Sequence, residues 1–533
     1  MSTDAVSSSA RGAGFLILLQ VSSRALTFAL NQLLLRFLSP TLLGASVQLE
    51  LFVISAHHFA RESLRVACQR QPEGGIQAAI NLSYLAIAGG IPIVLALAQW
   101  YLTTSLPDVP YFVESLRIYQ LAAVIELLSE PAFVAVQQNM LYKSRAAAEA
   151  SAVVLKTLAT AGTVFWSQHE QLELGVLPFA AGELAYCSTL TLVYLWQTIP
   201  VATNQHFSLL PKSIKSSTAN ANAFLLSLFP TSLVNLSLSL YLQQGIKYLL
   251  TEGDVIVSTT LASLEDQGMY ALSANYGGLI ARMVFRPIED ASRNLFAKLC
   301  GDAKVDKMNS ASTTNNNKNT DNMKQAHQSL RLILRAYSIL SVICFAIGPA
   351  AAPLLLRLVA GARWSSSGAG EVLGIYSICI PLLAINGVSE AFVSATASTQ
   401  ELRNQSIWMG FFSLGFAGSA YLFLRVLNLG AKGLVLANCV NMGMRILFNL
   451  SFIASFFAKQ GVRFGMVDLL PNSFVVAAAV VMPSLIGRMQ GLFEAYGLLG
   501  DLLRVGGIGG AFALVVLVSE KDFLRDCWRR VRS

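Results

Sequence analysis

Residues 247–298, KYLLTEGDVIVSTTLASLEDQGMYALSANYGGLIARMVFRPIEDASRNLFAK, contain an apolar segment long enough to span a bilayer, with charged residues inside it. Counting about 100° per residue, one face of the expected helix is polar and the rest is apolar. The polar face carries Asn275, Gly278, Arg282, Arg286, Glu289 and Arg293. An arginine near the bilayer centre costs about 2.5–3.5 kcal/mol on insertion scales, so such residues usually face a bundle interior or a wet cavity. We therefore predict that this helix lines a polar cavity.

The composition of the chain is that of a polytopic membrane protein. Its 533 residues are 54% hydrophobic and 13% charged, which is about half the charged fraction of a soluble globular protein. The mean hydropathy is +0.55. The net charge is +8, but the basic residues are spread over separate loops and form no block of the kind that binds nucleic acid. We expect membrane lipids and no nucleic acid as partners.

Windows of about 20 apolar residues predict the membrane helices. They lie near 13–38, 41–60, 76–102, 111–139, 146–166, 175–199, 222–248, 267–297, 329–358, 371–397, 404–426, 430–457, 467–489 and 496–519, which makes fourteen. With a cytosolic N-terminus, twenty-one basic residues fall in or beside the cytosolic segments and seven in or beside the opposite loops. The positive-inside rule then predicts that both termini are cytosolic.

Two changes of composition divide the chain. Residues 200–221 contain two prolines and several Ser and Asn residues, and residues 301–327 are of low complexity. The fold class that we predict is all-α, with two pseudo-symmetric six-helix lobes and two further C-terminal helices. The parts are a disordered cytosolic N-terminus at 1–12, an N-lobe at 13–199, a cytosolic linker at 200–221, a C-lobe at 222–458 with a flexible cytosolic loop at 301–327, two helices at 459–519 and a basic cytosolic tail at 520–533.

Polar residues also mark the first two predicted helices. Arg24 shares a face with other polar residues, whereas Arg36 lies near the membrane edge, where a long side chain can reach the interface. The second helix ends in Arg61, Glu62 and Arg65. We interpret these three residues as an interfacial charge cluster at the cytosolic end, which pairs with itself.

Acids and a further arginine lie within later helices. Glu126 and Glu130 are deep in the fourth apolar span and need partners, which could be cavity arginines. Glu390 and Arg445 lie in the tenth and twelfth spans, and Glu252 lies at the end of the seventh.

Arg24, Arg282, Arg286 and Arg445 could converge on a central cavity. For each, a structural ion pair and a ligand role both remain open. Guanidinium groups bind phosphate and diphosphate through two parallel hydrogen bonds. The hypothetical substrate is therefore a lipid-linked or amphipathic anion.

The sequence lacks the common motifs of enzymes and of nucleotide-driven transporters. It contains no GxxxxGK[ST], HExxH, GxSxG, GxGxxG or DxD pattern, so we predict no cofactor, no metal and no enzymatic activity. The seven cysteines show no CxxC and no metal-ligand spacing, and we interpret them as small core residues.

Several runs then match one family in order along the chain. They are FLILLQVSSRALTFALNQLLLRFLSP at 15–40, FARESLRVACQR at 59–70, LLSEPAFV at 127–134, LLTEG at 249–253, DQGMYALSANYGGLIARMVFRPIED at 266–290, LLAINGVSEAF at 382–392 and LANCVNMGMRI at 436–446. The chain resembles the eukaryotic Rft family of oligosaccharidyl-lipid flippase-like proteins. The resemblance implies the fold of the multidrug/oligosaccharidyl-lipid/polysaccharide (MOP) exporter superfamily, with two bundles around a cavity that opens alternately to each side.

The resemblance also implies a function and a set of residues. The function is supply of the dolichol-diphosphate-linked Man5GlcNAc2 intermediate to the lumenal side of the endoplasmic reticulum (ER) for N-glycosylation, alongside other ER glycosylation proteins. The positions that match the family's charged residues in the cavity are Arg24, Arg36, Glu252, Arg282, Glu289 and Arg445, and those of the cytosolic-end cluster are Arg61, Glu62 and Arg65. Arg286 departs from the family pattern, in which a neutral amide precedes Pro287.

Three hypotheses follow. The first is a flippase that works by alternating access without ATP. The second is an accessory protein that binds the lipid-linked oligosaccharide without moving it. The third, a membrane transferase, needs a nucleophile or metal site that the sequence does not show.

Overall fold

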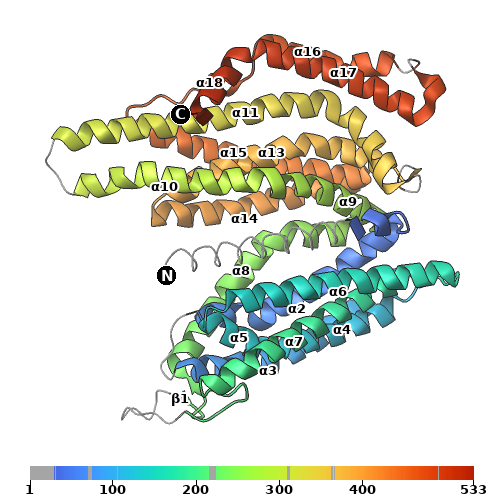
Figure 1. Cartoon of the computed structure of the whole chain (residues 1–533), viewed down its shortest axis with the longest axis vertical. Coiled ribbons are helices and arrows are strands. Elements are labelled where there is room, and N and C mark those ends of the chain that lie inside the picture. The colour runs from blue at the N-terminus through green and yellow to red at the C-terminus, as the bar shows by residue number, and fades with distance from the viewer. Residues whose placement is uncertain are drawn as a thin grey trace, which may run out of the picture. The chain divides into compact units, whose positions relative to one another are not determined.

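The computed structural model describes residues 29–532, apart from residues 31, 70–74, 105, 215–223, 309–312, 362–363, 365, 490 and 492. The chain folds into two compact units, Met1–Ile256 and Val257–Ser533. In the described residues nearly all regular structure is helical (Figure 1).

The first unit is a bundle of helices with one short hairpin. In chain order its elements are α2 (Pro40–Ala67), α3 (Gly75–Thr104), α4 (Phe112–Leu127), α5 (Glu130–Gln138), α6 (Tyr142–His169), α7 (Leu177–Asn204), β1 (Phe224–Leu225), β2 (Phe229–Pro230) and the greater part of α8 (Thr231–Leu261). The strands pair antiparallel, with Phe224 opposite Pro230. Each of α2, α3, α6 and α7 packs against at least one other helix of the bundle.

The second unit contains the longest helices of the chain. Its elements are α9 (Leu264–Ile280), a π-helical turn (Ala281–Phe285), α10 (Arg286–Met308), α11 (Thr313–Ala360), α13 (Ala369–Thr396), α14 (Thr399–Tyr421), a second π-helical turn (Leu422–Val426), α15 (Gly430–Lys459), a 3-10 turn (Met466–Leu469), α16 (Ser473–Arg488), a 3-10 turn (Glu494–Tyr496), α17 (Gly497–Ser519) and α18 (Lys521–Arg532). Helix α13 packs against α10, α11 and α15 (Figure 1).

Local sequence explains where several helices begin. Ser39 precedes Pro40, and its hydroxyl accepts a hydrogen bond from Leu42 N, so a cap and a first-turn proline start α2 together. Ser398 and Glu401 form a reciprocal capping box at the start of α14. These caps satisfy backbone donors that a helix start otherwise leaves open.

Helices lie over every apolar segment that we predict from 41–60 onwards. The first predicted segment, 13–38, lies mostly outside the described residues, as does the predicted disordered segment 1–12. By length and composition, seven helices of the described residues can cross a membrane, or eight if α4 and α5 form one span. The two units divide within α8, so the place of residues 222–256 in a C-lobe remains a prediction.

Two predicted irregular segments are more ordered than expected. Helical backbone runs through most of the predicted flexible loop 301–327, because α10 continues to Met308 and α11 begins at Thr313. That run contains no proline, so nothing in it blocks helical hydrogen bonding. In the predicted linker 200–221, Lys212 is held by Asn81, whose Nδ2 donates to the Lys212 carbonyl at 2.7 Å.

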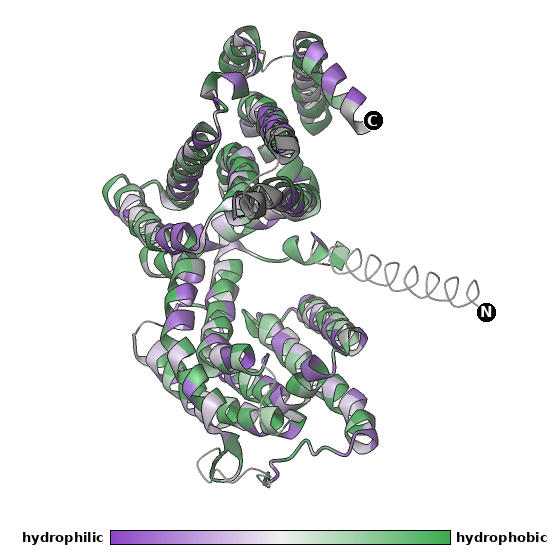
Figure 2. Ribbon diagram, turned by 90° about the vertical axis from the view of Figure 1, so that its left-hand side faces the viewer, coloured by the Kyte–Doolittle hydropathy of each residue, from purple (hydrophilic) through white to green (hydrophobic). Residues whose placement is uncertain are grey.

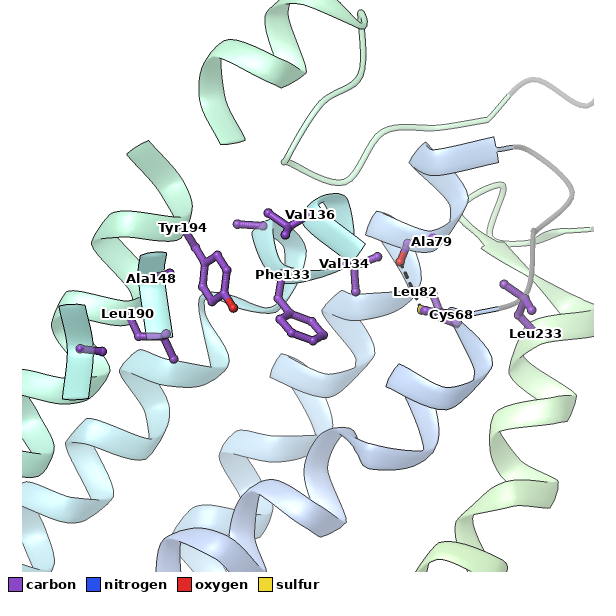
Figure 3. Packing of buried hydrophobic residues seen from close by; sticks show 12 residues of the cluster. Cys68, Ala79, Leu82, Phe133, Val134, Val136, Ala148, Leu190, Tyr194 and Leu233 are labelled. Atoms are coloured by element: carbon purple, nitrogen blue, oxygen red, sulfur yellow. Dashed lines mark hydrogen bonds between the residues drawn. The ribbon is translucent and has the colours of Figure 1, made fainter. Parts of the chain in front are cut away.

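The core of the first unit joins elements that are distant in sequence. Cys68, Leu82, Phe133 and Tyr194 belong to one buried cluster (Figure 3), in which the thiol of Cys68 donates to the carbonyl of Ala79. The rings of Phe133 and Tyr194 meet edge to face with centroids 6.0 Å apart.

The outward surface is apolar, as a bilayer requires. Trp196, Leu242 and Leu447 expose 74%, 75% and 70% of their surface, and hydrophobic residues run along most of the helices in Figure 2. Apolar exposure on this scale would be unfavourable in water and is satisfied by lipid.

One prediction about the cysteines is wrong. Cys379 of α13 and Cys439 of α15 form a disulfide with a Cα–Cα distance of 5.7 Å, rather than two isolated core thiols. Sixty residues separate them, so no local spacing could have revealed the pair. The remaining cysteines, Cys68, Cys187, Cys300, Cys344 and Cys527, are free.

Candidate functional site

The fourth predicted span is a helix broken between two acids. Helix α4 ends at Leu127 and α5 begins at Glu130, with a bend of 40° between them. Pro131 has no N–H to donate to the Leu127 carbonyl, so the helical ladder fails at this point. The Ser129 hydroxyl donates instead to the carbonyl of Glu126 at 2.7 Å. The break leaves the carboxylates of Glu126 and Glu130 on either side of it.

Both carboxylates bind arginines of α2. Arg61 donates from Nη2 to Glu126 at 2.7 Å and from Nη1 to Glu130 at 3.0 Å. Arg65 grips Glu130 with two hydrogen bonds, 2.9 Å from Nε and 2.5 Å from Nη2. His57 Nδ1 lies 3.7 Å from the second oxygen of Glu126. The cluster thus ties α2 to both halves of the broken helix.

From the sequence we predicted that Arg61, Glu62 and Arg65 pair with one another. In the structure the two arginines instead bind acids of other helices. Glu62 is half-buried and forms no ion pair or hydrogen bond among the described residues. Arg61 and Arg65, four residues apart, share the face of α2 that meets α4 and α5, and their partners are Glu126 and Glu130 of those helices. The guanidinium of Arg65 also lies 3.8 Å above the ring of Phe133, a cation–π contact.

A further group of ion pairs, centred on Lys156, lies beside this cluster. Our reading of the sequence did not predict it. Lys156 of α6 lies 2.7 Å from Glu183 of α7 and 3.5 Å from Glu50 of α2. The thiol of Cys187 donates to Glu126 at 3.3 Å and so connects the two groups. Lys156 and Glu183 lie within apolar spans, and the rule that intramembrane charges need an explanation could have found them.

These residues make up a polar network that we call the N-unit network: Glu50, His57, Arg61, Arg65, Glu126, Glu130, Lys156, Glu183 and Cys187. Its buried or half-buried part holds three cationic and three anionic side chains, so the charges balance. Removing one partner of a buried pair costs about 3–5 kcal/mol, because the other charge is left uncompensated. The network therefore fixes helix positions, and its arginines are already occupied.

A metal ion does not fit into this network. One carboxylate oxygen of Glu126, one of Glu183 and the thiol of Cys187 lie within 4.8 Å of one another, which is close enough for a shared cation. However, Arg61 and Lys156 already neutralise both carboxylates. A further cation would have to displace these pairs.

Glu252 lies near a polar contact between α2 and α8. One helical turn before it, the hydroxyl of Tyr248 is 2.5 Å from that of Ser55, and its ring is 4.7 Å from the ring of His58. His58 Nε2 is 3.0 Å from the carbonyl of Gln244. Glu252 itself is half-buried.

In the second unit, Arg445 of α15 binds Glu390 of α13 at 2.9 Å. The amide of Asn386 donates to the same carboxylate at 3.3 Å. Beside them Asn449 donates to Ser389 at 3.3 Å. Arg445 Nε and Asn386 Oδ1 are buried and make no hydrogen bond among the described residues. One hydrogen-bond donor, Arg445 Nε, and one acceptor, Asn386 Oδ1, are thus left without a partner in the described residues.

Glu289 of α10 packs against the same helix α13. Its carboxylate binds Arg293 at 2.9 Å and would be 2.9 Å from a Cβ added at Gly387, so it lies directly against α13. The structure thus places Glu289, Glu390 and Arg445 around one segment of α13.

The predicted polar face of residues 275–293 is interrupted by the π-helical turn. Pro287 cannot donate to the Met283 carbonyl, and the N–H of Arg286 bonds to Ala281, five residues back. A π-helical turn holds one extra residue, so the helix beyond it is rotated by about 100° from the α-helical expectation. Arg286 is exposed, and it lies after the turn with Glu289, so the rotation separates both residues from Asn275 and Gly278.

Three further arginines, Arg24, Arg36 and Arg282, were predicted as cavity residues. Arg36 is exposed in the turn after the first described helical residues. Arg24 and the side chain of Arg282 lie outside the described residues. Convergence of arginines from both lobes on one cavity stays a prediction.

Comparisons with known proteins agree on one family. A family model described as "Rft protein" matches residues 8–530. A relative from Yarrowia lipolytica is 33% identical, covering 90% of this chain and 75% of its own length. Another from Mus musculus is 32% identical, covering 91% of this chain and 89% of its own. Both carry the name Man(5)GlcNAc(2)-PP-dolichol translocation protein RFT1.

Solved structures show the fold. Lipid II flippase MurJ, in an inward closed conformation, aligns with a TM-score of 0.58 at 13% identity, covering 96% of this chain and 99% of its own. An inward-facing multidrug resistance MATE family transporter of the MOP superfamily aligns at 0.51 and 15% identity, covering 81% and 94%. The chain is a helical, multi-pass membrane protein with a fold of the MOP flippase type, and it belongs to the Rft family.

Proposed function

We propose that this protein translocates dolichol-diphosphate-linked Man5GlcNAc2 across the ER membrane for N-glycosylation. The observation that carries the proposal is the agreement of relatives from yeasts and mouse, whose names state this translocation and whose similarity extends over most of the chain. The fold, which resembles that of a lipid II flippase, is compatible with this function.

The proposed mechanism is alternating access without ATP and without enzymatic chemistry. Fourteen helices would form two six-helix lobes and a C-terminal pair, with both termini in the cytosol. The sugars would cross in the wet interior while the polyprenyl tail stays in lipid. Transfer of a bare diphosphate into hydrocarbon would be prohibitive, so the cavity has to supply compensating charge.

Arg445 is the best described candidate for that charge. Its Nη2 holds Glu390, but its Nε has no partner among the described residues. A diphosphate could bind the remaining donors of the planar guanidinium bidentately. Arg24 and Arg282 would contribute from the other predicted positions, with Arg36, Glu252, Arg286 and Glu289 along the path.

Expression in cells that lack their own Rft protein tests the proposal. We expect wild-type protein to restore transfer of complete glycans to a reporter glycoprotein. Failure of a well-expressed, ER-located protein to restore transfer would contradict it.

The second candidate is an accessory protein that binds the lipid without moving it. The observation in its favour is that the described intramembrane charges are mostly neutralised within each unit. Cysteines placed in the lumenal loops of the two lobes and cross-linked would separate the two functions. A flippase loses function when locked and recovers on reduction, whereas an accessory protein keeps it.

A further inference from the structure

A pocket at the end of α15 combines aromatic rings with hydroxyl groups. It has a volume of about 200 Å³ and is lined by Phe448, Phe452, Phe456, Ser451, Ser455 and Lys459. Glu401, at the start of α14, also lines it. All of these residues belong to the second unit. The space is about that of one sugar ring.

The aromatic rings are held in place by further rings behind them. Phe452 and Phe456 stack with centroids 6.3 Å apart and 23° between their planes. Phe456 meets Phe392 of α13 at 5.4 Å, and Phe448 meets Trp408 of α14 at 6.0 Å. Fixed rings offer preformed, electron-rich faces, so binding would cost little side-chain entropy.

The two serines are unusual among the hydroxyls of these helices. In α14, Ser406 and Ser413 donate to carbonyls one turn back in their own helix. Ser451 and Ser455 are exposed and form no hydrogen bond among the described residues. In a helix surface covered by lipid tails such hydroxyls would turn to the backbone. Both hydroxyls line the pocket, so they are available to a polar ligand there.

The pocket continues the face that carries Arg445. Residues 445, 448, 452, 455 and 459 follow one another at spacings of three and four, which places them in one stripe along α15. Arg445 and Phe452 are seven residues apart, a rise of about 10 Å. A diphosphate at Arg445 would therefore place the first sugars attached to it beside the rings.

We propose that this pocket binds a neutral sugar ring of the oligosaccharide head group. Apolar C–H faces of the sugar would stack on Phe448 and Phe452, while Ser451 and Ser455 exchange hydrogen bonds with its hydroxyls. Pockets that combine apolar walls with a few placed polar groups are typical of small-ligand sites. The inference rests on the proposed function and adds to it a recognition site for the glycan, separate from that for the diphosphate.

Binding to the purified full-length protein in nanodiscs tests the inference with two ligands. One is dolichyl diphosphate alone, and the other is the same lipid carrying Man5GlcNAc2. We expect wild-type protein to bind the glycosylated lipid more tightly. Phe452→Ala should weaken binding of the glycosylated lipid about tenfold, equal to about 1.4 kcal/mol, and leave that of the bare lipid unchanged.

Three further variants guard against loss of folding. Phe452→Trp keeps an aromatic face and should retain most of the preference. The double variant Ser451→Ala, Ser455→Ala removes only two hydroxyl groups. It should weaken binding of the glycosylated lipid and leave binding of the bare lipid unchanged. Leu447→Ala truncates an exposed side chain of α15 that does not line the pocket, and it should change the binding of neither lipid.

The outcomes separate this inference from the proposed function. If Phe452→Ala retains the full preference for the glycosylated lipid, or if wild-type protein shows no preference, the sugar pocket is refuted while the proposed function stands. If wild-type protein binds neither lipid, both are refuted. Selective loss of the preference in Phe452→Ala and in the double serine variant, with Leu447→Ala unaffected, supports the pocket.

Discussion

At the scale of single residues, Glu130 is the most buried charged side chain of the N-unit network. Its side chain is 1% exposed and binds both Arg61 and Arg65. We expect Glu130→Gln to reduce stability by about 3–5 kcal/mol, because a buried guanidinium then lacks its counter-charge. Thermal unfolding in detergent measures the effect.

A matched control for this change is Glu149→Gln. Glu149 also binds an arginine, Arg145 at 2.8 Å, but both side chains are nearly half exposed. Such surface pairs contribute about 0–1 kcal/mol. Replacing Arg65 with Gln in the Glu130→Gln background should recover part of the loss. Equal melting temperatures for the Glu130→Gln and Glu149→Gln variants would refute the structural role of the network.

The cysteines give a second prediction at this scale. Only five of the seven thiols should react with an alkylating reagent in unfolded, unreduced protein, because Cys379 and Cys439 are joined. After reduction all seven should react. Mass spectrometry counts the labels, and seven labels before reduction would show that the disulfide is absent.

At the scale of elements, close helix contacts depend on small residues. A Cβ at Gly90 of α3 would lie 2.7 Å from Leu127 Cδ1 and 2.8 Å from the Cβ of Ala60, whereas a Cβ at Gly89 would meet nothing within 4 Å. Gly90→Ala should therefore cost about 1–3 kcal/mol through overpacking. Gly89→Ala is the control and should be neutral or slightly stabilising, since alanine favours helix.

Melting temperatures of these two glycine variants in the same detergent give the comparison. A decrease for Gly90→Ala alone would confirm the tight packing of α3 against α2 and α4. If both variants melt with the wild type, α3 is not packed as closely as the structure shows.

The sequence predicts the positions of the helices better than their local irregularities and mutual contacts. Apolar runs predict most of the helices, because a bilayer requires about 20 apolar residues for each span. The same counting could not predict the π-helical turn before Arg286, which arises from the missing N–H of Pro287 and rotates the helix. It also could not pair Arg61 with Glu126, because that contact depends on how separate helices pack.

At the scale of the whole molecule, the distribution of Lys and Arg predicts the orientation. Tags at both termini should be accessible after selective permeabilisation of the plasma membrane. An acceptor sequon inserted at Gly361, between α11 and α13, should be glycosylated, and one inserted at Gly461, after α15, should not. The reverse pattern would invert the topology and place the sugar pocket on the lumenal side.

The central claim is translocation, and reconstitution tests it most directly. Purified protein in sealed liposomes with labelled dolichol-linked heptasaccharide should make more of the lipid accessible to an outside probe than protein-free vesicles do. Replacing Arg445 and Glu390 together with Gln removes the guanidinium but leaves the site neutral, so accessibility should decrease while the melting temperature holds. Wild-type vesicles that expose no more lipid than protein-free ones, although the protein binds it, would contradict translocation and favour the accessory function.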